Sequence, residues 1–226
     1  ARRKVAITGT SEFPDLAETA ERTLDVKPPD ARPERTGRGG EPNTPFADIT
    51  AKLRDGATIA DVTPPAASAV RCEPLPSRRL AEPFEMLRDA ADAFARTTGG
   101  RPQVFLANLG PLAEHNTRAT WIRNLLAAGG IATVDTPGFT ATQEIGRVFA
   151  ESGQAVACIC GTDERYGELA DAAAQALKSA GAQFVAIAGR PAGPITGIEA
   201  VDAYYFAGMD ALDALATLHE ALDVGK

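Results

Sequence analysis

Short apolar runs alternate regularly with longer amphipathic runs from residue 101 onward, which is the pattern of βαβ units. The strand-like runs are 103–109, 131–134, 155–160, 183–188 and 203–206, and the helical runs are 117–128, 141–152, 164–180 and 210–222. Glycine stands at positions 129, 153 and 181, where a left-handed residue commonly ends a helix. Strands joined in this way predict a flavodoxin-like α/β domain over residues 101–226, with a five-stranded parallel sheet and helices on both faces.

The first hundred residues differ in composition: they are rich in proline and in polar, glycine-containing segments such as residues 35–41. Such segments bury too little apolar surface to order themselves, so we expect residues 1–100 to be an inter-domain linker that wraps a neighbouring domain. Residues 5–9 have the character of a short strand. Two helices are predicted within the linker, one near 46–55 and one over 79–97. We expect the second helix to pack on the domain that follows it.

Composition and charge exclude several classes of function. The net charge of −7 argues against nucleic acid or an anionic membrane as the main partner. No apolar run approaches the ~20 residues that span a bilayer, and no secretory segment opens the chain. Three cysteines are too few for a disulfide scaffold, and they predict reduced thiols in a cytoplasmic protein. Cys158 and Cys160 are one residue apart, and we expect them to point to opposite faces of a strand.

The loop after the first strand is the place to look for chemistry, because open α/β sheets bind ligands at their carboxyl edge. Gly110 and Pro111 form the turn, and we expect the helix to start at residue 116 or 117. The loop lacks the three glycines of a dinucleotide site, the lysine of a P-loop and the serine of a hydrolase elbow. A signalling receiver domain is disfavoured too, because Cys160 stands where its phosphorylatable aspartate belongs.

The two histidines are the remaining candidates for a metal or cofactor ligand. His219 lies in the last helical run, and we expect a partly exposed structural residue. His115 lies close to a helix start, where it either ligates a metal or cofactor or hydrogen-bonds at the end of the helix. Asp163 and Glu164 follow the third strand, and we expect a helix cap there rather than an acid/base pair.

Three segments resemble a known family. Residues 101–110 (RPQVFLANLG) are similar to the first strand of the cobalamin-binding domain of methylmalonyl-CoA mutases. Residues 7–14 (ITGTSEFP) resemble the segment that leaves the substrate barrel of that family, and residues 53–62 (LRDGATIADV) resemble its linker. The resemblance covers nearly the whole chain in order. It implies that the chain is the C-terminal part of a longer protein whose missing portion is a coenzyme A-binding (β/α)8 barrel.

The resemblance fails at the cobalt-binding motif. In the family, the first loop carries Asp-x-His-x-x-Gly, whose histidine coordinates cobalt while the aspartate orients the imidazole. Counted from Gly110, those three places hold Leu112, Glu114 and Thr117. A shift by one residue makes His115 the ligand but leaves alanine and arginine at the other two places. Neither register rebuilds the motif.

The positions that contact the cofactor tail in the family are altered as well. The turn after the third strand begins with Cys160 and Gly161, and a glycine pair after the fourth strand is reduced to Gly189. Arg190 follows, and we expect its long cationic side chain to fill the space of the nucleotide tail.

These departures imply the small, non-catalytic subunit of a heterodimeric methylmalonyl-CoA mutase, an isomerase. Its degenerate cofactor site would comprise Gly110, Leu112, Glu114, His115, Thr117, Cys160, Gly161 and Gly189. We expect no catalytic residue, metal or cofactor in this chain, with adenosylcobalamin held by the large catalytic subunit. The alternative is a domain that still binds cobalamin, either base-on or through His115 as cobalt ligand, in an acyl-CoA mutase.

Overall fold

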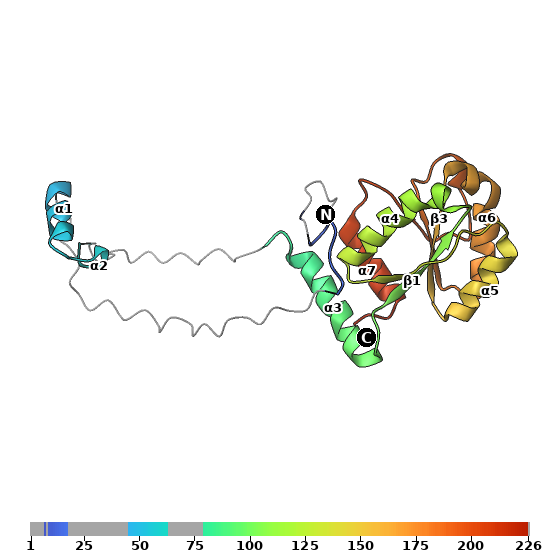
Figure 1. The fold of residues 1–226 in the computed structure, drawn as a ribbon, viewed down its shortest axis with the longest axis horizontal. Coiled ribbons are helices and arrows are strands. Elements are labelled where there is room, and N and C mark those ends of the chain that lie inside the picture. Colours follow the sequence, from blue (N-terminus) through green and yellow to red (C-terminus); the bar gives the residue numbers. More distant parts are fainter. Residues whose placement is uncertain (1–6, 8, 18–44, 63–78, 226) are drawn as a thin grey trace. The chain divides into compact units, whose positions relative to one another are not determined.

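The computed structural model describes residues 7, 9–17, 45–62 and 79–225 (Figure 1). The chain forms two compact units, one from residues 1–18 and 78–226 and the other from residues 19–77. The proline-rich stretches predicted to wrap a neighbouring domain, at 18–44 and 63–78, lie outside the described residues, as does most of the strand expected at 5–9.

The larger unit is built on a five-stranded parallel sheet, which confirms the predicted flavodoxin-like α/β fold. Its strands are β1 (Gln103–Asn108), β2 (Ala132–Val134), β3 (Val156–Cys160), β4 (Phe184–Ala188) and β5 (Ala203–Tyr205). The strand order is β2-β1-β3-β4-β5. This order reverses between β1 and β3, so the crevice at which such sheets bind ligands lies at the carboxyl ends of these two strands.

Helices cover both faces of the sheet (Figure 1). On one face lie α3 (Glu82–Thr98), α4 (Leu112–Ala128) and α7 (Ala211–Ala221). On the other face lie α5 (Thr142–Ser152) and α6 (Asp163–Ser179). A short 3₁₀ helix, η1 (Gly193–Ile195), connects β4 to β5. The helix predicted over 79–97 is therefore present as α3, and its buried Phe84 joins the core of the sheet.

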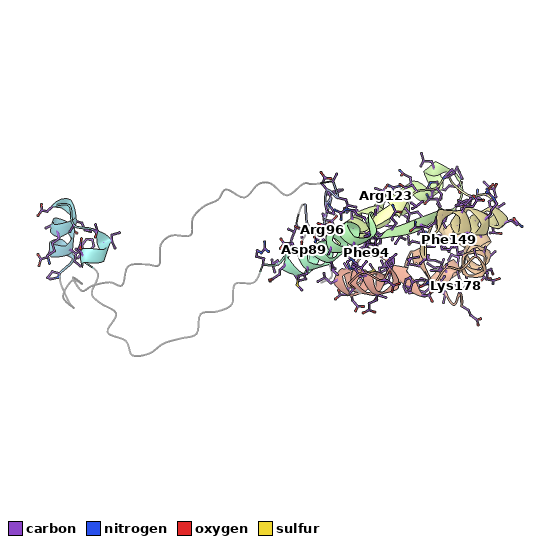
Figure 2. All side chains as sticks on the ribbon, turned by 90° about the horizontal axis from the view of Figure 1, so that it is seen from below. Asp89, Phe94, Arg96, Arg123, Phe149 and Lys178 are labelled. Carbon is purple, nitrogen blue, oxygen red and sulfur yellow. The ribbon has the colours of Figure 1, made fainter. Side chains whose placement is uncertain are left out.

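Alternate residues of each strand point into two separate core clusters. In β1, Val104 and Leu106 pack beneath α3, α4 and α7, whereas Phe105 packs beneath α5 and α6. Phe149 of α5, labelled in Figure 2, lies in the second cluster. Its ring is edge-on to that of Phe105, with 5.3 Å between the centroids. Because both faces are covered, the strands are mostly apolar instead of alternating with polar residues.

Two expectations about buried residues were wrong. Cys158 and Cys160 lie in the same core cluster, because side chains alternate along a strand with a period of two and residues two apart share a face. The hydrogen bond to Cys160 and burial raise the pKa of the Cys158 thiol. His219 is 5% exposed rather than partly exposed. Its Nε2 lies 2.8 Å from the carbonyl oxygen of Gly129, so the imidazole links α7 to the end of α4.

Residues 9–17 are fastened to the larger unit by side chains of α3 and α4. The backbone N–H of Phe13 donates to Asn124 Oδ1 at 2.6 Å, and Asn124 Nδ2 donates to Glu12 at 2.7 Å. Arg88 of α3 donates to the carbonyl of Thr10 at 2.8 Å. This N-terminal segment thus contacts α3 and α4, although α3 begins some 65 residues later in the chain.

The smaller unit contains α1 (Phe46–Arg54), which confirms the helix predicted near 46–55, and α2 (Ile59–Val62). Phe46 and Ile59 are largely exposed, and α1 has no buried residue.

Candidate functional site at the carboxyl edge of the sheet

The turn from β1 into α4 is shorter than the sequence predicted. Gly110 adopts φ +74°, and Pro111 takes the extended conformation that precedes a helix, so α4 begins at Leu112 instead of residue 116 or 117. The prediction was wrong because it required a side-chain cap, whereas proline and glycine redirect the backbone within two residues. His115 therefore lies in the first turn of α4, and Leu112 and Thr117 are exposed on the helix.

His115 is 3% exposed and hydrogen-bonded to the turn that precedes it. Its Nδ1 lies 3.0 Å from the carbonyl oxygen of Gly110. A carbonyl only accepts hydrogen bonds, so Nδ1 carries the proton and donates it to Gly110. No aspartate orients this imidazole: its one hydrogen-bond partner among the described residues is a backbone carbonyl.

The loop after β2 closes over the same turn. The backbone N–H of Phe139 donates to the carbonyl of Asn108 at 2.7 Å, and Phe139 accepts from the N–H of Gly110 at 2.8 Å. Gly138 packs so closely that an added Cβ would overlap the carbonyl oxygen of Gly110 and lie 3.1 Å from Cε1 of His115. The turn and the imidazole are thus covered by backbone.

Glu114 of α4 is paired across the edge with Arg165 of α6. Arg165 Nε donates to Glu114 at 2.5 Å, and its Nη1 donates to Glu168 at 2.8 Å. The hydrogen bond from Arg165 lowers the pKa of the Glu114 carboxyl. The side chains of Glu114 and Arg165 also stand where a Cβ at Gly110 would point, so the pair lies directly over the β1 turn.

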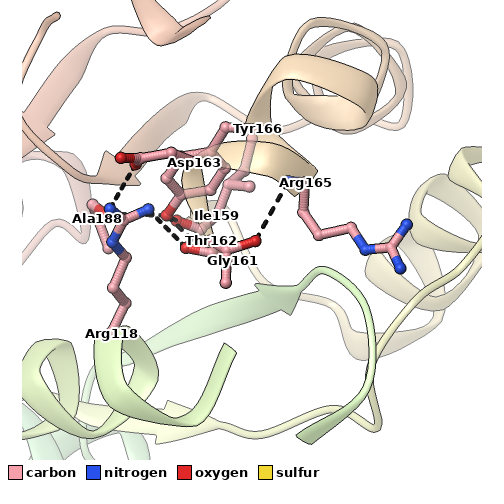
Figure 3. Close-up of polar contacts among 8 residues, drawn as sticks. All are labelled: Arg118, Ile159, Gly161, Thr162, Asp163, Arg165, Tyr166 and Ala188. Atoms are coloured by element: carbon pink, nitrogen blue, oxygen red, sulfur yellow. Dashed lines mark hydrogen bonds and ion pairs between the residues drawn. The ribbon is translucent and has the colours of Figure 1, made fainter. Parts of the chain in front are cut away.

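A second arginine, Arg118 of α4, reaches the turn after β3 (Figure 3). Arg118 donates to the carbonyl of Gly161 at 2.6 Å and to Asp163 at 2.5 Å. Its guanidinium lies 4.8 Å from the centroid of the Tyr166 ring. The residue that caps α6 is Thr162, whose hydroxyl accepts from the N–H of Arg165 at 3.3 Å. The expectation that Asp163 caps the helix was wrong, because that carboxylate is exposed and pairs with Arg118.

Tyr166 connects the carboxyl ends of β3 and β4 (Figure 3). Its hydroxyl accepts from the N–H of Gly161 at 3.0 Å and lies within donating distance of two carbonyls, Ala188 at 2.9 Å and Ile159 at 3.2 Å. The side chain is 1% exposed. Burial raises the pKa of the phenol, so the hydroxyl keeps the proton that it donates.

The predicted site residues are only partly brought together. Gly110, Glu114 and His115 meet at the β1 turn, and Gly161 and Gly189 flank the Tyr166 ring. Cys160 lies in the core beneath the edge.

Arg190 does not fill the space that a nucleotide tail would need, as had been expected. Its exposed side chain lies over the ring of Phe206, 4.7 Å from the centroid. Instead, Tyr166 occupies the space between Gly161 and Gly189.

Tyr166 and Arg118 are the residues that sequence reasoning missed. Tyr166 stands on the inward stripe of α6 that continues with Ala170, Ala173 and Ala174. A large, polar aromatic residue at the start of an alanine-rich buried stripe was the available signal, because it must project beyond its small neighbours toward the strand ends.

Neither a metal cluster nor a membrane helix is found in the described part of the chain. No group of three or more histidine, cysteine, aspartate or glutamate residues there is placed to hold a metal ion. Among the described helices, none has the length and apolarity needed to cross a bilayer.

Comparison with known proteins identifies the family. No family model matches the chain. Curated relatives do match: the methylmalonyl-CoA mutase small subunit of Streptomyces virginiae is 38% identical over 224 residues, covering 99% of this chain and 29% of that protein. The chain belongs to the methylmalonyl-CoA mutase small-subunit family.

Two further relatives agree with this membership. The probable methylmalonyl-CoA mutase small subunit of Mycobacterium tuberculosis is 37% identical over 190 residues, which are 84% of this chain and 23% of that protein. The methylmalonyl-CoA mutase small subunit of Propionibacterium freudenreichii subsp. shermanii is 29% identical over 232 residues, which cover 100% of this chain and 29% of that protein. The chain therefore spans less than a third of the length of these small subunits.

Proposed function

We propose that this chain is part of a non-catalytic small subunit of a heterodimeric, adenosylcobalamin-dependent methylmalonyl-CoA mutase. Its sheet domain keeps the architecture of a cobalamin-binding domain without the cofactor site, and the subunit supports a large catalytic subunit structurally. Membership of a family whose members are named small subunits supports the existence of that partner.

The residues at the carboxyl edge do not fit a corrin. A cobalt ligand needs an exposed imidazole nitrogen held by a second residue, usually a carboxylate. His115 is buried in the first turn of α4, donates to a backbone carbonyl and is covered by Gly138. No step of a cobalamin reaction is therefore assigned to this chain.

The space that a nucleotide tail would need is also occupied. Tyr166 lies between the two glycines that end β3 and β4, and Arg118 covers its ring. The single observation that carries the proposal is this occupied edge: Tyr166 satisfies the strand-end backbone groups, and the Glu114–Arg165 pair lies over the β1 turn.

The test is the cofactor stoichiometry of the whole complex. The complete small subunit is co-expressed with a large subunit from the same source that carries an intact Asp-x-His-x-x-Gly motif, and cobalt is counted in the purified complex. The proposal predicts one cobalamin per pair of subunits. A matched complex, in which the histidine of the large-subunit motif is changed to alanine, should bind none. One cobalamin retained by that complex would assign the cofactor to the small subunit, through His115 or otherwise.

A further inference from the structure

Phe13 combines two features that are unfavourable for an isolated domain. Its backbone adopts φ +49°, in the left-handed region that a bulky side chain rarely enters, and its side chain is 77% exposed. The other described non-glycine residue with positive φ is Asp223, and aspartate tolerates this conformation far better. Strained backbone of this kind persists where surrounding contacts impose it, and it is found most often at functional sites.

Two helices of the sheet domain hold the strained turn in place. The backbone N–H of Phe13 donates to Asn124 of α4 at 2.6 Å, and the side-chain amide of Asn124 donates to Glu12 at 2.7 Å. Arg88 of α3 donates to the carbonyl of Thr10 at 2.8 Å. These contacts fix the backbone and leave the ring of Phe13 in solvent. The domain thus sets the direction of the ring without burying it.

A fixed, exposed aromatic ring is what binding to a separate protein requires. Aromatic side chains that become buried at an interface contribute much of the affinity, and holding them beforehand in the bound conformation lowers the cost of association. A contact with another part of the same chain forms during folding and gains little from being held in advance. The fixed position of Phe13 therefore favours a separate partner.

Carboxylates flank the ring in the sequence. Glu12 precedes Phe13, and Asp15 follows it after Pro14. Asp15 is exposed, and its Oδ1 accepts from the N–H of Ala17 at 2.9 Å. A carboxylate has about four acceptor positions, so Asp15 can also accept from a cation of a partner. By charge complementarity, this surface fits an apolar pocket that has lysine or arginine side chains on its rim.

We propose that Phe13 is the residue through which the small subunit docks on the large catalytic subunit, with its ring in an apolar pocket that has a basic rim. Burial of the ring in the complex offsets the strain and exposure that the free chain bears. The inference rests on the proposed function, which supplies the large subunit as the partner.

Phe13→Asn separates binding from folding. Asparagine tolerates the left-handed conformation, so the midpoint temperature of the 226-residue chain, and of the complete small subunit alone, should stay the same or rise. The Kd of the complete small subunit for the large subunit should increase at least about tenfold, measured by surface plasmon resonance. A lower midpoint temperature in either chain would show that the ring stabilises the small subunit itself, which would overturn the proposal. An unchanged Kd would also overturn it.

Phe46→Asn is the matched control. Phe46 is 83% exposed but lies in the ordinary helix α1, so its substitution should change the Kd by less than about twofold. Equal weakening by the two substitutions would contradict the special role of the strained turn. Salt should weaken binding of the unmodified subunit, and less so in Asp15→Asn; equal salt dependence would exclude the basic rim. Failure of the unmodified small subunit to bind the large subunit would instead refute the proposed function, and this inference with it.

Discussion

The Tyr166 hydroxyl should contribute far more to stability than its few atoms would indicate. In Tyr166→Phe the ring stays between the ends of β3 and β4, and only the hydrogen bonds of the Tyr166 hydroxyl are lost. Tyr205→Phe provides the matched control: its hydroxyl is equally buried but has no hydrogen-bond partner among the described residues. Both substitutions remove a buried hydroxyl oxygen, which is hydrogen-bonded in Tyr166 and has no partner among the described residues in Tyr205.

The magnitude follows from those contacts. Tyr166→Phe removes one accepted and one donated hydrogen bond, each contributing about 0.5–1.5 kcal/mol net, and leaves a buried backbone N–H unpaired at a cost of about 1–3 kcal/mol. Because these contributions overlap, we expect a loss of about 2–4 kcal/mol. At about 2–4 °C per kcal/mol, the midpoint temperature should fall by roughly 4–16 °C. Tyr205→Phe should lie within about 0.5 kcal/mol of the unmodified chain or be more stable, since it removes an unpaired polar atom from the core.

Urea denaturation followed by circular dichroism measures both free energies of unfolding. The denaturation midpoint of Tyr166→Phe should fall at an unchanged slope, since the surface exposed on unfolding stays the same. Equal losses in the two variants, or a loss below about 0.5 kcal/mol in Tyr166→Phe, would refute the reasoning that the hydroxyl ties the strand ends together.

Two further outcomes are expected from the same measurements. Gly138→Ala should lose about 1–3 kcal/mol, because its Cβ would overlap the Gly110 carbonyl, whereas Gly100→Ala, with open space around it, should change little; equal effects would contradict the packing of the two turns. Burial lowers the pKa of His219 below the ordinary value of 6.5, so the unfolded chain takes up the proton first and stability should fall as pH drops below about 6.5. Unfolding free energies measured between about pH 8 and pH 5 should depend less on pH in His219→Gln, and an unchanged dependence would exclude this role.

The fold was predictable because its signal is repeated along the chain. Five apolar runs separated by helical runs each carry the same information, so an error at one boundary does not change the topology. The helix start at Leu112 was missed because one turn depends on the conformations of two residues, Gly110 and Pro111, rather than on a repeated pattern.

The candidate site was less predictable, because its contacts join residues that are distant in sequence. The sequence located the edge and the missing cobalt-ligand motif, but the Arg165–Glu114 pair spans 51 positions and the Arg118–Asp163 pair spans 45. The reach of a side chain across the edge depends on helix orientation, which is why Arg190 was expected in the slot that Tyr166 fills.

The central proposal is that this chain does not bind adenosylcobalamin. Titration of the purified 226-residue chain with adenosylcobalamin, followed by ultraviolet–visible absorbance, tests it most directly. We predict that the spectrum of the cofactor stays that of the free compound at every protein concentration. A spectral change that reports a protein nitrogen on cobalt, and that disappears in His115→Ala, would contradict the account.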